Sequence, residues 1–243
     1  MHKLVLPLLT LFFLVLACES SVETGSEGVT TAKDLGNEIR AAAKTTDRST
    51  AIVGNTHSPH VKLKSIPIGD CRWTEGFWAD KFKVAEEVVV PYMGSLLTGD
   101  VGHALNNFKI AAGLKDGKHK GMHWHDGDFY KWMEAAMYVY AINRDEKILA
   151  ELDEYIAIIG QAQQPDGYLQ TQVINRDHVS RYENRKFHEM YNSGHLYTSA
   201  VIHHRVTGQT NFLDIAIRHA DELYATFSPQ PKELARFGFN QTQ

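Results

Sequence analysis

The residues best suited to chemistry lie within one stretch of ten positions, 123–132. It reads His-Trp-His-Asp-Gly-Asp-Phe-Tyr-Lys-Trp and so contains two histidines, two carboxylates and two tryptophans. An indole face can stack on the C–H face of a sugar, whereas imidazoles and carboxylates can bind its hydroxyls. The stretch therefore predicts a carbohydrate contact made by Trp124, His125, Asp126 and Asp128. The alternative is a capped helix with two solvated histidines.

A second polar cluster spans residues 188–195 and reads His-Glu-Met-Tyr-Asn-Ser-Gly-His. Seven residues make nearly two helical turns, so one helix face would be shared by His188, Tyr191, Asn192 and His195. The two histidines are not one turn apart, so this is not the zinc-binding His-Glu-x-x-His arrangement. A metal site built from His188, His195 and the loop around Asp126 is conceivable. A polar helix face with a satisfied histidine is the alternative.

The elements that position these clusters are predicted to be helices. Apolar residues recur at helical spacing from Phe129 to Tyr140, and Asp126 or Asp128 is placed to cap the first turn. The same spacing, together with proline and glycine stop signals, predicts five more helices: Trp78–Leu96 with a kink at Pro91, Val101–Ala112, Asp145 to Gln163, His188–Val206 and Asn211–Phe227. A short edge strand is expected within Val61–Ile68, and a short extended piece at Tyr168–Thr171.

Helix follows helix with short turns, so the fold class is predicted to be all-α. The second half of the chain matches the first at an offset of about 65 residues, which pairs Asn143 with Gly208 and Ile148 with Leu213. Such an offset indicates a repeated helical hairpin. Hairpins stacked side by side either continue as a solenoid or close into a ring.

The N-terminus has the pattern of a targeting signal. The apolar run Leu4–Ala17 is too short to span a bilayer but has the length of a secretory signal core. It ends at Cys18 and resembles a bacterial lipobox, which predicts lipidation of this cysteine; an ordinary signal peptide is the alternative. We therefore expect a signal peptide over 1–18, a flexible tether over 19–58 and a folded region over 59–243. The protein would be secreted across the inner membrane and lipid-anchored in the bacterial envelope, at the periplasm or cell surface.

Charge and cysteine content argue against two further features. The formal net charge is −4 and no basic block is present, which argues against a nucleic-acid partner. If Cys18 carries the anchor, Cys71 has no intrachain partner, so a disulfide framework is not expected. Cys71 is predicted to be a buried free thiol.

Several stretches, taken together and in order, resemble glycoside hydrolase family 127, the β-L-arabinofuranosidases. They are Trp73 to Trp78, Asn107–Gly113, Asp126–Ala135, Gln163–Leu169, His188–Tyr191 with Gly194 and His195, and Val206–Gly208. The resemblance implies an (α/α)6 toroid, preceded here by a short extended segment, whose central funnel holds one terminal arabinofuranose of an oligosaccharide or glycan. It implies that His188 contacts the sugar in the terminal subsite and that the Asp126–Asp128 loop lines the funnel. Trp124, His125 and Tyr191, from the two polar clusters, are the further candidates for substrate binding.

The family's chemistry is a retaining exo-hydrolysis in which a zinc-held cysteine attacks the sugar and a glutamate serves as acid and base. Those residues lie beyond the matched stretches, and no cysteine follows Cys71. We therefore expect no catalytic residue and no metal ligand within this chain, with zinc required only by the complete domain, of which the chain would hold the first half. The family commonly has Asp-Ser-Asp where this chain has Gly127 in the middle.

Three rival interpretations remain open. The first is another toroidal sugar enzyme, such as an unsaturated uronyl hydrolase, in which Asp126 and Asp128 would carry the chemistry. The second is a sugar-binding lipoprotein without catalysis. The third is a helical scaffold that binds no ligand.

Overall fold

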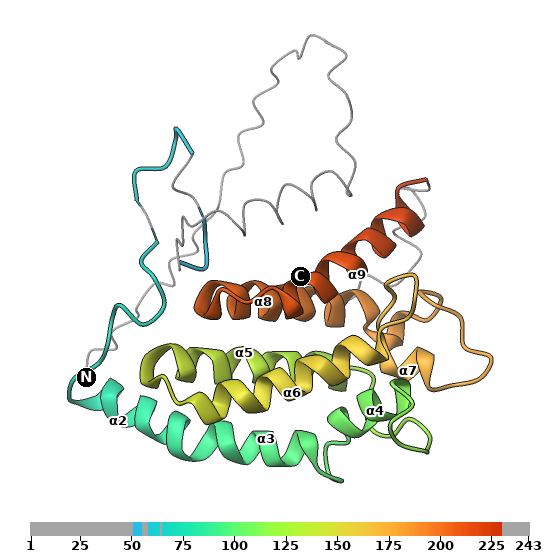
Figure 1. The fold of residues 1–243 in the computed structure, drawn as a ribbon, viewed down its shortest axis with the longest axis horizontal. Helices are drawn as coiled ribbons and strands as arrows, with labels where there is room; N and C mark the ends of the chain where they lie inside the picture. The colour runs from blue at the N-terminus through green and yellow to red at the C-terminus, as the bar shows by residue number, and fades with distance from the viewer. Residues whose placement is uncertain (1–50, 55–57, 64, 230–243) are drawn as a thin grey trace, which may run out of the picture. The chain divides into compact units, whose positions relative to one another are not determined.

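The computed structural model describes residues 51–54, 58–63 and 65–229. These residues form helices, turns and irregular segments but no strand, which confirms the all-α prediction (Figure 1). The elements are α2 (Phe77–Val84), a π-helical turn (Ala85–Val89), α3 (Val90–Thr98), α4 (Ala104–Ala111), α5 (His125–Asn143), α6 (Glu146–Ala162), α7 (Thr171–Ile174), a 3-10 turn (Arg185–Phe187), α8 (Glu189–Thr207) and α9 (Asn211–Phe227). The edge strand expected within residues 61–68 is wrong, because the described part of the chain contains no neighbouring strand to pair with it.

The first long helical segment bends around a proline. Pro91 has no N–H, and its ring would crowd the carbonyl oxygen of Glu87, four residues earlier. The π-helical turn directly before α3 widens the backbone there, so the predicted kink takes the form of a π turn. After the π turn, α3 packs on α5: the Trp132 Nε1–H donates to the Val90 carbonyl at 2.8 Å. A Cβ added to Gly94 would lie 2.6 Å from the Trp132 ring, so the two helices approach closely.

One apolar face of this segment has no neighbour among the described residues. Phe77, Trp78 and Tyr92 are each more than 60% exposed, and Val88 and Val89 are about half exposed. This is the face that the sequence pattern marks as apolar, whereas the packed face is a different one. The segment is therefore apolar on two sides, and only one of them is covered.

The predicted repeat of helical hairpins is confirmed. Helices α5 and α8 each contain 19 residues, and helices α6 and α9 each contain 17. The starts of α6 and α9, Glu146 and Asn211, are 65 positions apart, as the sequence offset predicts. The Asp145 side chain caps α6 by accepting from the Lys147 N–H at 3.0 Å. The second hairpin turns at Gly208, whose φ of 78° suits glycine.

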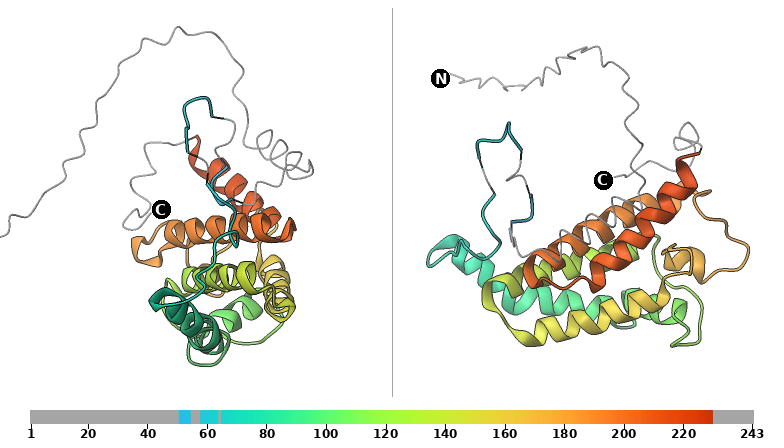
Figure 2. Two further views of the ribbon diagram at one scale, coloured as in Figure 1. Left: turned by 90° about the vertical axis from the view of Figure 1, so that its left-hand side faces the viewer. Right: turned by 45° about the horizontal axis from the view of Figure 1, so that its top comes forward.

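Helix α5 lies between α3 and α8 (Figures 1 and 2). Helices α5 and α8 run parallel, because successive bonds between them advance along both: Gly127 bonds Asn192, and Ser199 Oγ donates to the Tyr130 carbonyl at 2.7 Å. A shared core of aromatic and aliphatic side chains joins the helices, and its largest fully buried members include Phe108, Phe129, Tyr130, Met133, Ile156, Leu196 and Phe212. This packing fixes the starts of α5 and α8 side by side.

Several local predictions need correction. Helix α5 begins at His125 without any side-chain cap, so neither Asp126 nor Asp128 caps it. Helix α4 begins at Ala104 rather than Val101, because His103 adopts a left-handed φ of 59° that cannot lie within a helix. Cys71 is exposed rather than buried.

The N-terminal predictions fall largely outside the described residues. Cys18 and the apolar run before it lie there. Within the range predicted as a tether, Ala51 is buried and Ile52 packs against the core, so contact with the helical body extends into this segment. In the part of the chain that the structure describes, no helix has the length and apolarity needed to cross a membrane.

Candidate functional site

The starts of α5 and α8 bring together three rings from the two polar clusters. Trp124 and His188 are the residues directly before the two helices, and their ring centroids lie 5.4 Å apart in an edge-to-face arrangement. The Tyr191 ring lies 5.8 Å from His188, again edge to face. Trp124 is 38% exposed, and the other two residues are half-buried. We call Trp124, His188 and Tyr191 the aromatic rim.

The hydrogen bond of His188 defines its tautomer. Its Nδ1 lies 2.7 Å from the Lys186 carbonyl oxygen, and a carbonyl can only accept. The Nδ1 therefore carries the proton, and in the neutral ring Nε2 is an acceptor. The backbone of His188 has a φ of 58°, which is uncommon for a residue other than glycine. The rim thus offers two aromatic faces and an imidazole acceptor.

Asp126 lies beneath the rim and is only 2% exposed. One carboxylate oxygen accepts from the Thr171 N–H at 2.7 Å, and the other accepts from the Thr171 hydroxyl at 2.6 Å. Burial raises the pKa of Asp126 to about 6, against the effect of these two hydrogen bonds. This geometry does not favour direct contact with a ligand. It ties the first turn of α5 to the start of α7.

Asp128 lies at the edge of the rim and pairs with a residue that sequence reasoning missed. Lys131 Nζ donates to Asp128 Oδ1 at 2.8 Å and to the Tyr191 hydroxyl at 2.8 Å. The three side chains form a polar bridge from α5 to α8. The spacing of three residues between Asp128 and Lys131 on one helix was the signal that could have identified this pair.

His125 belongs to a neighbouring group of imidazoles. It accepts from the Met122 N–H at 3.3 Å, so it faces the loop before α5, and burial lowers its pKa. His119, on the same loop, contacts the Arg176 guanidinium at 3.4 Å. Burial, followed by the nearby charges of Arg176 and three histidines, lowers the pKa of His119 to about 4. His119 and His125 are therefore neutral at neutral pH.

Buried amides support the rim from below, and sequence reasoning missed most of them. Gln170 and Gln172 flank Thr171 and are each 1% exposed. Gln172 bonds the ring of His123, and Gln170 donates to the Phe187 carbonyl at 3.0 Å. Their partners immediately precede Trp124 and His188. A polar run in a short extended piece was the only signal in the sequence.

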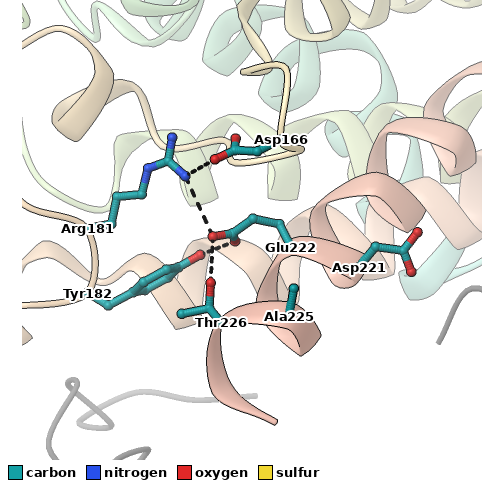
Figure 3. Close-up of a pocket in the computed structure, with 7 residues that line it drawn as sticks. All are labelled: Asp166, Arg181, Tyr182, Asp221, Glu222, Ala225 and Thr226. Atoms are coloured by element: carbon teal, nitrogen blue, oxygen red, sulfur yellow. Dashed lines mark hydrogen bonds and ion pairs between the residues drawn. The ribbon is translucent and has the colours of Figure 1, made fainter. Parts of the chain in front are cut away.

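A pocket of about 500 Å³ lies next to this site, at the far end of α9 (Figure 3). Arg181, Tyr182 and Thr226 converge there on Glu222, while Asp221 points away from them. Arg181 pairs with Asp166, and the hydroxyls of Tyr182 and Thr226 both donate to Glu222. Since these groups satisfy one another, we interpret the pocket as a structural network.

That network is anchored on the residue after His188. The Glu189 carboxylate accepts from the Tyr182 N–H at 2.8 Å and from the Tyr168 hydroxyl. Burial raises the pKa of Glu189 to about 7. The Ser193 hydroxyl lies 2.9 Å from His219 Nε2, which extends the network to α9. Glu189 thus ties the start of α8 to the segments that contain Tyr168 and Tyr182.

The metal site considered for His188, His195 and Asp126 does not form. Across residues 51–54, 58–63 and 65–229, no three His, Cys, Asp or Glu side chains lie close enough together to hold a metal ion. Asp126 directs both oxygens to Thr171, and the Nδ1 of His188 is bound to a backbone carbonyl.

Comparison with known proteins identifies relatives of one kind. The family model described as the catalytic domain of GH127 β-L-arabinofuranosidases matches residues 70–241. The non-reducing end β-L-arabinofuranosidase of Bifidobacterium longum subsp. longum is 35% identical over 183 residues, which cover 66% of this chain and 28% of that protein.

Solved structures give the same result. A GH127 β-L-arabinofuranosidase from Geobacillus stearothermophilus T6 is 38% identical with a TM-score of 0.61, covering 63% of this chain and 25% of that one. The GH127 β-arabinofuranosidase BT3674 is 28% identical with a TM-score of 0.58, covering 69% of this chain and 31% of that one. The chain therefore spans about a quarter to a third of the length of these relatives.

Proposed function

This chain belongs to glycoside hydrolase family 127, and on that premise we propose that it forms part of a hydrolase that releases terminal β-L-arabinofuranose from glycans. The observation that carries this proposal is the aromatic rim. It lies within the matched residues, at the paired starts of α5 and α8. A furanose ring has C–H faces for stacking and hydroxyls for hydrogen bonds, and the rim offers partners for both.

Each residue of the rim, and each polar residue next to it, has a role that its geometry supports. The Trp124 indole would stack on the sugar, and His188 Nε2 would accept from a sugar hydroxyl. Lys131 and Asp128 would bind hydroxyls at the edge, beside Tyr191. Asp126 would hold α5 in place rather than touch the sugar, because both of its oxygens are bonded to Thr171.

The hairpins α5–α6 and α8–α9 would be units of an (α/α)6 toroid that continues beyond the residues present here. Two observations support this proposal. The chain covers 28% of its Bifidobacterium relative. In addition, the exposed apolar face of α2 and α3, which includes Phe77, Trp78 and Tyr92, has the character of a surface that another element covers.

The family's zinc and cysteine chemistry does not fit the described residues. No group of three metal-ligating side chains is present among them, and the Cys71 thiol is exposed on the segment before α2. We therefore assign no catalytic step to this chain. Its contribution is to bind and orient the terminal sugar.

Two rival functions remain to be separated by experiment. An unsaturated uronyl hydrolase would need Asp126 to reach its substrate, and burial of Asp126 counts against this. A sugar-binding protein without catalysis would use the same rim. We further propose that Cys18 is lipidated and anchors the protein in the bacterial envelope, on the sequence pattern described above.

Calorimetric titration of the 243-residue chain with methyl β-L-arabinofuranoside tests the proposal. Binding should be lost in Trp124→Ala and His188→Ala but kept in Trp78→Ala, since Trp78 is an exposed tryptophan on α2, outside the rim. The chain alone should not hydrolyse an aryl β-L-arabinofuranoside, with or without zinc. Tighter binding of an unsaturated uronide, or equal binding by all variants, would refute the proposed function.

A further inference from the structure

One buried amide connects the backbone on both sides of the rim. Asn192 is 1% exposed and lies one turn along α8 from His188. Its amide oxygen accepts from the Gly127 N–H at 3.0 Å. Its amide nitrogen donates to the His123 carbonyl and to Gln170 Oε1, both at 3.0 Å. The amide therefore links the first turn of α5, the loop before α5 and the segment before α7.

The first of these bonds depends on the absence of a side chain at Gly127. A Cβ added there would lie 2.5 Å from Asn192 Oδ1 and 3.3 Å from the Tyr191 ring. Gly127 lies within a helix, where glycine is unfavourable by about 1 kcal/mol relative to alanine. Contact with Asn192, rather than backbone conformation, thus accounts for the glycine. The serine common in the family would not fit beside this asparagine.

The groups that Asn192 binds lie next to the rim residues. His123 precedes Trp124, and Gln170 in turn donates to the carbonyl of Phe187, which precedes His188. Both sides of the Trp124–His188 contact are therefore held through one side chain. The Asn192 amide bonds backbone groups of Gly127 and His123 and the side chain of Gln170, so its effect on the two rings would be exerted through backbone placement.

We propose that Gly127 and Asn192 are a positioning pair that sets the distance and orientation between Trp124 and His188. The inference rests on the proposed sugar-binding function of the rim. The close contact at Gly127 brings α5 and α8 together at this level, and the three hydrogen bonds of Asn192 fix how their starts are aligned. The pair thereby sets how the two rings are presented together to a single furanose ring.

The first arm of the test needs no ligand. The chain is labelled with 5-fluorotryptophan, and the Trp124 resonance is assigned in the ¹⁹F spectrum by Trp124→Phe. Asn192→Ala and Gly127→Ala should each shift this resonance. Ser199→Ala is the matched control, because it removes another buried α5–α8 hydrogen bond, farther from the rim, and should leave the resonance in place.

The double variant shows whether the two residues act as one unit. In Asn192→Ala the oxygen that the new Cβ would meet is gone, so adding Gly127→Ala should change the Trp124 resonance little further. Additive shifts, or an equal shift in Ser199→Ala, would overturn the positioning pair. If Asn192→Ala does not fold, Gly127→Ala carries the test alone, since it keeps every group of Asn192 and places a good helix former in a helix.

The second arm measures affinity for methyl β-L-arabinofuranoside. Binding should weaken roughly tenfold in Asn192→Ala and Gly127→Ala, but less than about twofold in Ser199→Ala. Unchanged affinity in the first two variants would overturn the inference. If the unmodified chain does not bind this sugar, the proposed function fails, while the ¹⁹F arm still decides whether Gly127 and Asn192 place Trp124.

Discussion

The buried carboxylate of Asp126 gives a quantitative prediction for Asp126→Asn. Asparagine can keep both contacts: its oxygen accepts from the Thr171 N–H, and its amide nitrogen donates to the Thr171 hydroxyl, which can reverse its role. The substitution therefore removes the ionisation of a buried group without breaking its hydrogen bonds. We expect Asp126→Asn to be more stable than the unmodified chain at neutral pH.

The magnitude follows from the pKa of Asp126, which burial raises from 3.8 to about 6 in the folded state. The difference corresponds to about 3 kcal/mol. A carboxyl group whose pKa is raised in the folded state contributes its full stabilisation below the pKa of the unfolded state. This contribution is lost as pH rises through the folded-state pKa. The free energy of unfolding of Asp126→Asn, relative to the unmodified chain, should therefore rise between about pH 4 and pH 7, by at most about 3 kcal/mol.

The assay is urea unfolding followed by circular dichroism at several pH values across this range. Thr171→Val is the matched comparison, because it removes the hydroxyl that donates to the carboxylate and so should increase the loss of stability with rising pH. Comparing variants cancels the contribution of Glu189, whose raised pKa acts in the same direction. If Asp126→Asn is less stable than the unmodified chain at neutral pH, by an amount that does not change with pH, the carboxylate is a stabilised ion and the reasoning fails.

Three further predictions use other residues. His203→Leu should increase stability most under acid conditions. Burial lowers the pKa of His203 to about 4, so below about pH 6.5 the unfolded chain binds a proton that the folded chain does not, and stability falls with pH. Urea unfolding at pH 5 and pH 7.5 measures this, and equal effects at both would contradict it. Gly167→Ala should destabilise by about 3 kcal/mol or more, because φ is 99° and the new Cβ would lie 2.2 Å from the Arg218 carbonyl; a thermal midpoint close to that of the unmodified chain would refute this. Cys18→Ser should release the protein from membranes into the soluble fraction, and an unchanged distribution on fractionation would exclude the lipid anchor.

The sequence predicted helices α6 and α9 well because their signals are local. Helix α9 has the bounds that apolar spacing indicates, Asn211–Phe227, and α6 begins directly after Asp145, where the sequence places its start. Prolines and glycines also marked the turns at residues 163–167 and 208. Helix α5 was harder, because it starts before its first apolar residue and without a cap, held by a contact from Thr171, 45 positions away.

The residue types of the site could be predicted from the sequence, but the contacts between those residues could not. Residue types placed Trp124 and His188 among the candidates, but nothing local indicates that their rings meet. The sequence repeat did contain that signal, since an offset of about 65 residues brings the two positions close to equivalence. Asn192 gave no comparable signal, because its importance arises from three partners on other segments.

Two features at the starts of α5 and α8 cost local stability. The absence of a side-chain cap is not one of them, because α2, α4 and α9 also begin without one. His188 has a left-handed backbone conformation, and burial of Asp126 disfavours the ionised form of its carboxyl group. By contrast, the turn between α8 and α9 and the start of α6 carry the usual glycine and aspartate signals. Residues that weaken their own helices yet present aromatic and imidazole groups at one rim are expected where ligand binding, rather than folding, determines their identity.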